Sequence, residues 1–260
     1  MGYSDPSRQF TPNQVVLGFD TPDGLVAVQA NQLHDQLTVA CWGDGSDWLE
    51  PRITDLFGLN DSADDFQPTC KLRSLVTEHS GMLLPRLPNV FEKLTQVVLQ
   101  QLVSWTDAFR GWKQLVKRFG VDLPGPHGLR KGPGAKQLLN LGYADLVACE
   151  IMPKQARLIL RLAKDAKRIE RLAATDPEKL ANYLLSIRGI GDWTVQHLLG
   201  TALADPDAVI VGDYGLPHSV SWFFQQKPRS DDEEMVRLLE PYRGNRFRVI
   251  ALLWLSLIHI

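Results

Sequence analysis

Two glycines that are one residue apart interrupt a helical pattern in the stretch 187-IRGIGDWTVQHLL-199. The segment before them follows Asp176-Pro177, which supplies a helix cap and a first-turn proline. The segment after them, 192-DWTVQHLLGTALA-204, continues with helical spacing. Glycine is needed where the backbone takes a positive φ or approaches another group closely, and Ile190 between the glycines can be buried. The stretch therefore predicts two helices joined by a tight hairpin.

Such a hairpin can bind a phosphate without any positively charged side chain. The N–H groups of the turn and of the following helix N-terminus carry partial positive charge and point toward the same place. A turn that only packs two helices together explains the same pattern. The hairpin alone leaves a DNA contact and a plain packing turn both open.

The composition is that of an ordinary globular chain and restricts how nucleic acid could bind. The 260 residues are 44% hydrophobic and 22% charged, and the formal net charge is -2. The pI near 6.3 shows none of the basic excess typical of nucleic-acid-binding proteins. Any binding of DNA must therefore be local.

Cysteine usage and apolar content bear on metal sites and on the compartment. Cys41, Cys70 and Cys149 are far apart in sequence, with no Cys-x-x-Cys and no clustered histidines, so neither a disulfide framework nor a metal site is predicted. The chain starts without a basic segment followed by an apolar run, and no stretch approaches the ~20 apolar residues of a membrane span. We predict a cytoplasmic protein with no membrane partner.

Secondary-structure signals change character along the chain. Three short apolar runs at 14–20, 24–30 and 36–42 indicate antiparallel strands, and 48–59 has helical spacing. From Pro88 onward the signals are almost entirely helical. We therefore predict a mainly α fold with two regions, an α+β region over 1–80 and an all-α region over 81–260.

The helix predicted from Pro153 has a basic outer face. Its apolar stripe contains Leu158, Leu162, Ala166 and Ile169, and its other faces carry Arg157, Arg161, Lys164 and Lys167. These cations either contact phosphates or are simply solvated, and they do not by themselves indicate a function.

The last six residues, 255-LSLIHI-260, have two explanations. They match one translation of a transposon end that is widely used to prepare sequencing libraries, and they also fit the apolar end of a helix. We therefore leave them out of the fold argument.

A single aspartate, Asp213, stands in 209-VIVGDYGLP-217 just before another helical pattern. Taken alone it is a helix-capping or turn residue. The combination with the hairpin changes this interpretation. LLSIRGIGDWTV resembles the helix-hairpin-helix of the DNA glycosylase superfamily (HhH-GPD), and VGDYGLP resembles the segment that holds its catalytic aspartate. The two segments occur in the expected order and spacing.

Within that superfamily the sequence looks most like the DNA-3-methyladenine glycosylase II group. VVLQQLVSW upstream and 241-PYRGNRFRVIALLW-254 downstream support the resemblance, which covers roughly 88–254 and is weaker over the strand-rich start. It implies a helix-hairpin-helix glycosylase core that flips an alkylated purine out of duplex DNA for base excision repair.

The chemistry implied for Asp213 is hydrolysis of an N-glycosidic bond. Positive charge develops on the sugar, so a carboxylate beside it stabilises the transition state and orients water. No partner carboxylate is evident, which suits an alkylated base, because such a base is already cationic and leaves without protonation. Superfamily members that also cut the strand have a lysine where this chain has Trp193. Indole forms no Schiff base, so a monofunctional enzyme is expected.

The resemblance also assigns residues to the base pocket and to DNA. Trp193 can stack on a cationic base, and Tyr214 and His197 are expected beside it, although Trp193 is equally well explained as a core residue. Leu102 matches the position that fills the vacated stack, although a leucine in a helical pattern is usually core. The hairpin contacts to DNA are assigned to Gly189, Ile190, Gly191 and Thr194.

Some features leave alternatives open. Gly215 stands where close relatives often have histidine, which leaves the substrate range uncertain. Arg243, Arg246 and Arg248 fit phosphate contacts and surface salt bridges about equally. The alternatives to the proposed enzyme are a non-catalytic DNA-binding hairpin protein and a glycosylase for another lesion.

We expect a monomer that binds double-stranded DNA and needs no redox or organic cofactor. Hairpins of this family can hold a monovalent cation through backbone carbonyls, which the resemblance implies and the residues alone do not test.

Overall fold

The computed structural model describes residues 5–34 and 36–257. Its contacts divide the chain into two compact units, which interleave along the sequence. Unit 1 contains Met1–Ile53 and Pro88–Asp176, and unit 2 contains Thr54–Leu87 and Pro177–Ile260. The boundary predicted at residue 80 separates strand-rich from helical sequence, whereas the units follow packing. The predicted division into regions 1–80 and 81–260 stays a prediction.

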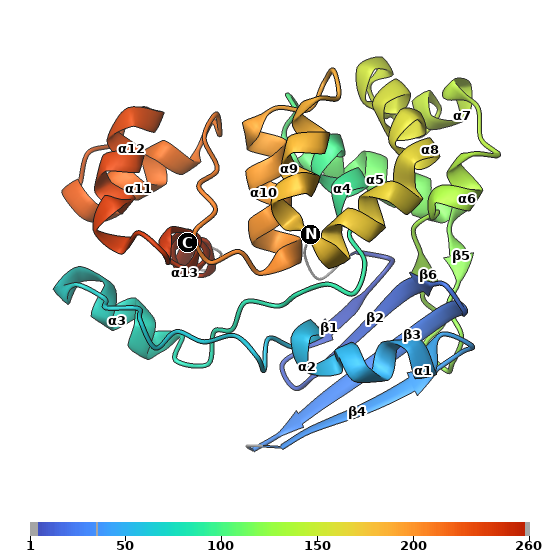
Figure 1. The fold of residues 1–260 in the computed structure, drawn as a ribbon, viewed down its shortest axis with the longest axis horizontal. Coiled ribbons are helices and arrows are strands. Elements are labelled where there is room, and N and C mark those ends of the chain that lie inside the picture. Colours follow the sequence, from blue (N-terminus) through green and yellow to red (C-terminus); the bar gives the residue numbers. More distant parts are fainter. Residues whose placement is uncertain (1–4, 35, 258–260) are drawn as a thin grey trace. The chain divides into compact units, whose positions relative to one another are not determined.

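Unit 1 begins with a four-stranded antiparallel sheet in the order β1-β2-β3-β4 (Figure 1). The three predicted strands are confirmed, and Phe19 pairs with Val26 while Leu17 pairs with Val28. Val26 and Val28 are fully buried on one face of the sheet, and Val16 and Ala27 are fully buried on the other, so both faces are partly covered. The bounds are β1 Gln9–Thr11, β2 Gln14–Thr21, β3 Gly24–Leu33 and β4 Gln36–Trp42.

Short helical turns follow the sheet where a single helix was predicted over 48–59. They are α1 Ser46–Leu49, the 3-10 turn η1 Glu50–Arg52 and α2 Ile53–Leu56. A proline at the second residue of η1 fits the change of helix type, because proline donates no backbone hydrogen bond.

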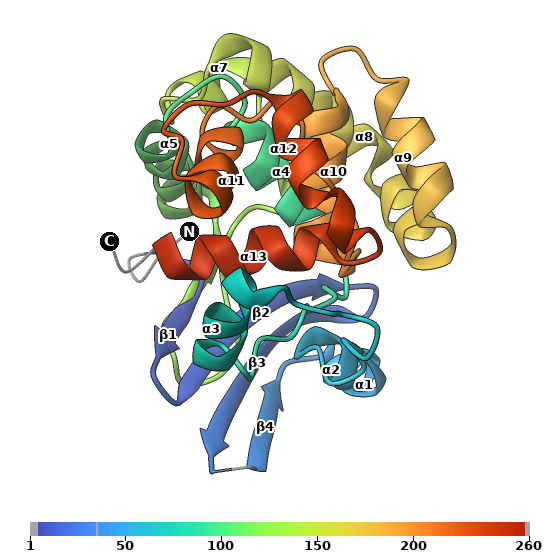
Figure 2. The same cartoon turned by 90° about the vertical axis from the view of Figure 1, so that its left-hand side faces the viewer.

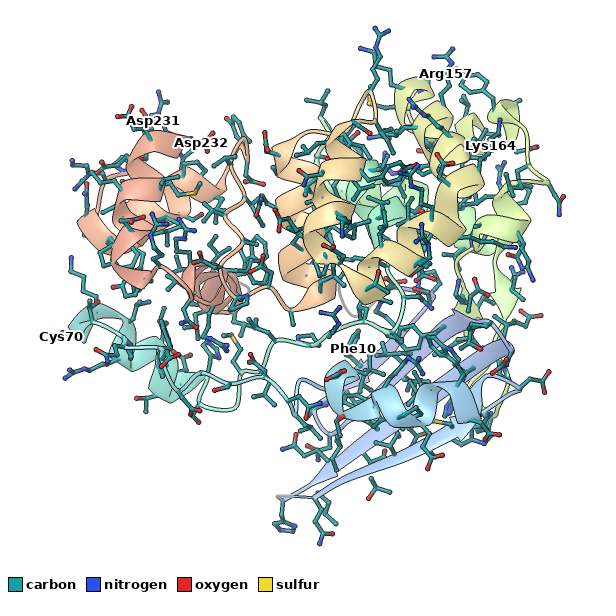
Figure 3. All side chains as sticks on the ribbon, in the orientation of Figure 1. Phe10, Cys70, Arg157, Lys164, Asp231 and Asp232 are labelled. Carbon is teal, nitrogen blue, oxygen red and sulfur yellow. The ribbon has the colours of Figure 1, made fainter. Side chains whose placement is uncertain are left out.

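Helix α8 is the longest helix described; α4, α6 and α7 pack against it, and α5 packs against α4. Their bounds are α4 Phe91–Leu99, α5 Trp105–Phe119, α6 Ala135–Leu138, α7 Tyr143–Val147 and α8 Pro153–Thr175, with a small hairpin of β5 Val121–Asp122 and β6 Arg130–Lys131. Leu158, Leu162, Ala166 and Ile169 are buried, as the apolar stripe predicts. The basic side chains of α8 are exposed, and Figure 3 shows Arg157 and Lys164 among them.

Charged side chains anchor the start of α4 within unit 1. The Glu170 carboxylate accepts hydrogen bonds from the N–H groups of Val90 (2.9 Å) and Phe91 (2.8 Å). Burial raises the pKa of Glu170 to about 7, although these N–H donors favour the charged form. Buried Lys131 pairs with Asp20 (2.9 Å) and Glu92 (3.0 Å) nearby. Burial disfavours its charge, but the two carboxylates outweigh burial and raise its pKa.

The regular elements described in unit 2 are helices, with one isolated β-bridge between Arg86 and Leu203. The unit contains α3 Cys70–Glu78, α9 Pro177–Leu185, α10 Asp192–Leu203, α11 Leu216–Gln225, α12 Asp232–Leu239, η2 Glu240–Tyr242 and α13 Arg246–Leu257. Helix α13 lies between α3 and α11 (Figure 2). The mainly α fold with a small antiparallel sheet is therefore confirmed.

Two further predictions concern the last six residues and membrane spans. Residues 255–257 continue α13, while 258–260, the rest of the LSLIHI stretch, lie outside the described residues. Among the helices that the structure describes, none has the length and apolar character needed to cross a membrane.

Candidate active site

The two hairpin glycines between α9 and α10 serve different purposes. Gly189 has φ +102°, a backbone conformation that favours glycine strongly. Gly191 is extended, with φ -122° and ψ -178°, which any residue adopts. Ile190 between them is 7% exposed, and its N–H donates to Ile187 O at 2.9 Å. The turn is therefore tight and its central side chain is buried, as predicted.

The N-terminus of α10 has open space beside Gly191 and no side-chain cap. A Cβ added to Gly191 would touch nothing within 4 Å, so packing inside unit 2 does not explain the glycine. Gly191 is the N-cap of α10, and no side chain caps this end. The backbone N–H groups of this helix N-terminus are open to a ligand beside Gly191, and the Asp192 carboxylate lies in the same first turn.

Thr194 lies one turn into α10 and is only 2% exposed. Its backbone N–H donates to Gly191 O at 3.0 Å. The DNA contact assigned to Thr194 stays a prediction, and its side chain would act from a buried position.

The carboxylate of Asp213 lies in the turn that leads into α11, two residues before the N-cap Gly215. Its Oδ1 accepts the N–H groups of Gly215 (2.9 Å) and Leu216 (2.8 Å). Of the two interpretations, helix cap or turn residue, the geometry fits the turn residue, because the N-cap of α11 is Gly215. These bonds also hold the turn at Gly215, whose φ of -102° requires no glycine.

The other oxygen of the same carboxylate reaches the hairpin helix. Trp193 Nε1 donates to Asp213 Oδ2 at 3.0 Å, and both side chains are half-buried. The two predicted residues, 20 positions apart, thus meet beside the hairpin. The turn fixes one oxygen and the indole fixes the other, so the carboxylate has a defined direction.

Aromatic rings continue from Trp193 along α10. The His197 ring lies 5.1 Å from the Trp193 ring in a T-shaped contact and 5.9 Å from the Trp254 ring. Trp254 ends the segment 241–254 that supports the family resemblance, and no site role is predicted for it. The structure thus brings His197 to Trp193, as expected from the resemblance.

Tyr214 is exposed, whereas Trp193 and Asp213 are half-buried. It is 93% exposed, and the ring contact described for it is with His218 at 6.0 Å. A tyrosine this exposed has room to move against a ligand, so its place in a base pocket stays a prediction.

Asp232, at the start of α12, is a carboxylate that sequence reasoning missed (Figure 3). Its Oδ2 accepts the N–H of Gly212 at 2.8 Å. Gly212 has φ +80° and directly precedes Asp213. Asp232 therefore fixes the turn that presents Asp213, a role that spacing in the sequence does not reveal.

Comparison with known families places this arrangement. The profile of the HhH-GPD superfamily base excision DNA repair protein matches residues 95–243, more than half of the chain. The chain belongs to this superfamily. It is a DNA glycosylase of base excision repair and acts on DNA.

Two curated relatives of this HhH-GPD protein come from Bacillus subtilis (strain 168). A DNA-3-methyladenine glycosylase is 24% identical over 215 residues, which cover 78% of this chain and 70% of the relative. A putative DNA-3-methyladenine glycosylase is 26% identical over 186 residues, which cover 69% of this chain and 63% of the relative.

Solved structures share the fold over almost the whole chain. The 3-methyladenine DNA glycosylase from Archaeoglobus fulgidus has a TM-score of 0.81 at 23% identity, covering 96% of this chain and 89% of the other. An 8-oxoguanine glycosylase/lyase of Clostridium acetobutylicum, solved with double-stranded DNA, has a TM-score of 0.66 at 11% identity, covering 97% and 98%. At these identities the likeness concerns the fold.

Leu102 of this HhH-GPD protein belongs to unit 1, between α4 and α5. Its side chain is 94% exposed and its φ is +57°, so it is not a core leucine. An exposed leucine held in a left-handed conformation is unusual and indicates a constraint from its surroundings.

The three arginines near the C-terminal helix each have a carboxylate partner. Arg243 pairs with Glu240 at 2.7 Å, Arg246 with Asp207 at 2.5 Å and Arg248 with Asp61 at 2.8 Å. Arg248 is 2% exposed and cannot reach a phosphate without leaving this pair. The salt-bridge explanation therefore fits Arg246 and Arg248 best, and exposed Arg243 remains accessible.

Proposed function

We propose that this protein is a monofunctional glycosylase that flips alkylated purines of the 3-methyladenine type from duplex DNA and hydrolyses their N-glycosidic bond. The observation that carries the proposal is the hydrogen bond between Trp193 and Asp213. It joins one oriented carboxylate to an indole, at a place where a strand-cutting relative would need an amine. The names of the two Bacillus relatives agree with this substrate class.

Asp213 would stabilise the cationic sugar of the transition state. A fixed charge is most effective where positive charge develops, because it needs no reorganisation during the reaction. Oδ1 is held by two backbone N–H groups and Oδ2 by the indole, so the carboxylate is fixed in this way. Oδ2 keeps a second lone pair that can orient the attacking water. The leaving purine needs no general acid if it already carries an alkyl group and a positive charge.

Trp193 would select charged bases. Its indole face attracts a cation, and the hydrogen bond from Nε1 fixes the ring relative to Asp213. His197 and exposed Tyr214 would complete the pocket. Neutral purines gain less from such a pocket, so damaged bases would be favoured.

The hairpin and Leu102 would hold the flipped DNA. The uncapped end of α10 and the open Gly191 would bind a phosphate, with Gly189, Ile190 and Thr194 shaping the turn. Leu102 would fill the stack that the base leaves. No organic cofactor enters the proposal.

The backbone carbonyls of the hairpin are the groups that would bind a monovalent cation. Ile187 O accepts one backbone N–H and keeps a lone pair that a monovalent cation could use, whereas Gly191 O already accepts the N–H groups of Thr194 and Val195. No cluster of His, Cys, Asp or Glu among the described residues could hold a metal ion.

The test is release of 3-methyladenine and 7-methylguanine from alkylated duplex DNA by the parent protein and by Asp213→Asn. Asparagine accepts the same turn bonds as aspartate, so the variant should fold. We expect base release to fall at least ~10³-fold with DNA binding retained. The parent should cut no strand until alkali is added.

Asp231→Asn is the matched control. Asp231 caps α12 through a 2.9 Å bond from Glu234 N, without touching Trp193. It should release bases like the parent. If the parent binds DNA tightly but releases no alkylated base, the protein is either a binding module or a glycosylase for another lesion, and an oxidised-purine duplex separates these outcomes.

A further inference from the structure

We propose that Gln155 is a positioning residue that holds Leu102 in the conformation required to enter DNA. The inference rests on the proposed function through the role of Leu102. It concerns a residue that neither the sequence motifs nor the comparisons assign. All of the contacts involved lie within unit 1.

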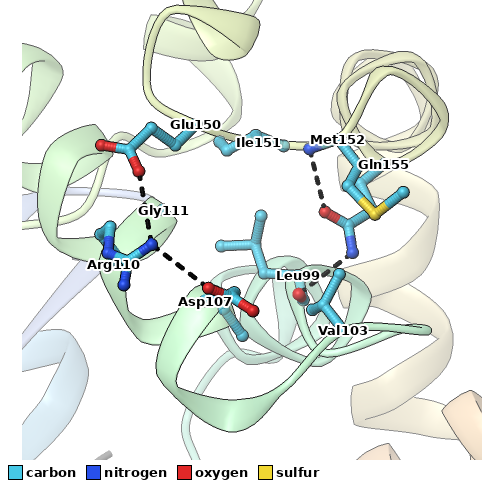
Figure 4. A pocket seen from close by; sticks show the side chains of 10 residues that line it. Leu99, Val103, Asp107, Arg110, Gly111, Glu150, Ile151, Met152 and Gln155 are labelled. Atoms are coloured by element: carbon cyan, nitrogen blue, oxygen red, sulfur yellow. Dashed lines mark hydrogen bonds and ion pairs between the residues drawn. The ribbon is translucent and has the colours of Figure 1, made fainter.

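Gln155 is a buried amide in the first turn of α8, with 5% of its surface exposed. Its Nε2 donates to Leu99 O at 3.1 Å and to Gln101 O at 2.8 Å. Its Oε1 accepts the N–H of Met152 at 3.3 Å (Figure 4). One side chain thus ties the loop after α4 to the start of α8, and only an amide offers both donors and an acceptor here.

The bond to Gln101 O acts directly on Leu102. The Gln101 carbonyl and the Leu102 N–H belong to one planar peptide group. Fixing the direction of that carbonyl fixes the rotation of the peptide plane, and therefore the φ of Leu102, which is +57°. A left-handed leucine costs about 1–2 kcal/mol, so it persists only if its surroundings hold it.

Other hydrogen bonds fix the two ends of the loop, and Gln155 fixes the peptide group that joins Gln101 to Leu102. Gln101 N donates to Val98 O at 3.2 Å, and Ser104 Oγ accepts the Asp107 N–H at 3.1 Å as the N-cap of α5. Leu102 lies in the short stretch between these two bonds, which neither of them holds directly.

A cavity beside the loop explains why the middle needs a clamp. Its volume is about 250 Å³, and Leu99, Val103 and Gln155 are among the residues that line it (Figure 4). A loop that lost the two bonds from Gln155 has room to fall inward, because apolar side chains gain by filling empty space. Leu102 would then be withdrawn.

The experiment measures binding to a duplex that contains a tetrahydrofuran abasic-site analogue and to the same duplex intact. This readout needs no base release. Gln155→Met keeps the volume and removes the hydrogen bonds. Gln155→Glu keeps the acceptor for Met152 and removes both donors. Gln96→Met is the matched control, since Gln96 is a buried amide of unit 1 whose side chain bonds Arg8 and Glu92 instead of the loop.

We expect Gln155→Met, Gln155→Glu and Leu102→Ala each to weaken binding of the abasic duplex about 10-fold, with binding of the intact duplex changed less than about twofold. The double variant Gln155→Met/Leu102→Ala should bind like Leu102→Ala alone, because the clamp acts through that side chain. Gln96→Met should bind like the parent.

The inference is overturned if the double variant loses about 100-fold, or if a folded Gln155→Met binds the abasic duplex like the parent. A normal affinity for Leu102→Ala also overturns it, since Leu102 would then not enter DNA. If the binding results hold but no alkylated base is released, the substrate class of the proposed function fails and the positioning role stands.

Discussion

The hairpin of unit 2 and the Leu102 loop of unit 1 both contain a positive backbone φ, but they obtain it differently. The hairpin uses Gly189 at φ +102°. The loop uses Leu102 at φ +57°, which is 94% exposed, and Gln155 holds the carbonyls of Gln101 in the loop and of Leu99 at the end of α4.

The difference follows from what each loop presents. The hairpin presents backbone N–H groups, so glycine supplies the conformation without strain. The other loop presents a side chain, so glycine would remove the group that matters. A loop that must display leucine in a left-handed conformation therefore needs a clamp from elsewhere in the fold.

The largest expected effect is a pH dependence of the free energy of unfolding that comes from Glu170 of unit 1. Burial raises its pKa from 4.5 to about 7 in the folded state, which therefore binds the proton more tightly than the unfolded chain. This contribution to stability is fully present below about pH 4.5 and is lost as the pH rises through about 7. The predicted loss is about 2–3 kcal/mol.

Glu170→Gln should remove that part of the pH dependence. The measurement is the free energy of unfolding in urea at pH 4.5 and pH 8 for the parent, Glu170→Gln and Glu178→Gln. Glu178 is exposed in the first turn of α9 in unit 2 and serves as the control. Equal pH slopes for the parent and Glu170→Gln would contradict the prediction.

The second test compares the two hairpin glycines. Gly189→Ala places a Cβ on a residue at φ +102° and should cost about 1–2 kcal/mol of stability. Gly191→Ala is extended and meets no atom of the protein, so its stability should stay within ~0.5 kcal/mol of the parent. Both should weaken duplex binding about 10-fold. Normal DNA binding by Gly191→Ala would exclude a close phosphate at the hairpin.

The last test replaces the exposed leucine of the other loop, Leu102→Gly, and should change stability little. Glycine relieves the left-handed strain in the folded state but makes the unfolded chain more flexible. The two effects oppose each other, so the free energy of unfolding should rise by between zero and about 1 kcal/mol. Binding of the abasic-site duplex should nevertheless weaken about 10-fold. Thermal unfolding and binding titrations on one preparation check both. A marked loss of stability would show that Leu102 packs against the protein.

Much of the fold could be predicted because its elements have local signals. The three long strands and the helices α4, α5, α8, α9 and α10 have clear periodicity or caps in the sequence. The strands β1, β5 and β6 were not predicted, since two or three residues are too few to show an alternation. The division into interleaved units depends on contacts between distant segments.

The candidate site shows the same limit. Asp213 and Trp193 were named from their motifs, and the turn bonds of Asp213 are local, but the bond between the two side chains depends on how α10 packs against the segment before α11. Asp232 and Gln155 have no local signal, because each acts on a backbone group far away in sequence, 20 positions away for Asp232 and 54 for Gln155.

The sequence by itself determined which segments are helices and strands, where the hairpin turns and which residues carry reactive or apolar groups. These properties depend on φ preferences, capping and periodicity, which act over a few residues. Only the tertiary structure decided which carboxylate meets the indole, which glycine faces open space and which amide holds Leu102. Hydrogen bonds and burial between distant segments have directions and distances, and these exist only once the chain is packed.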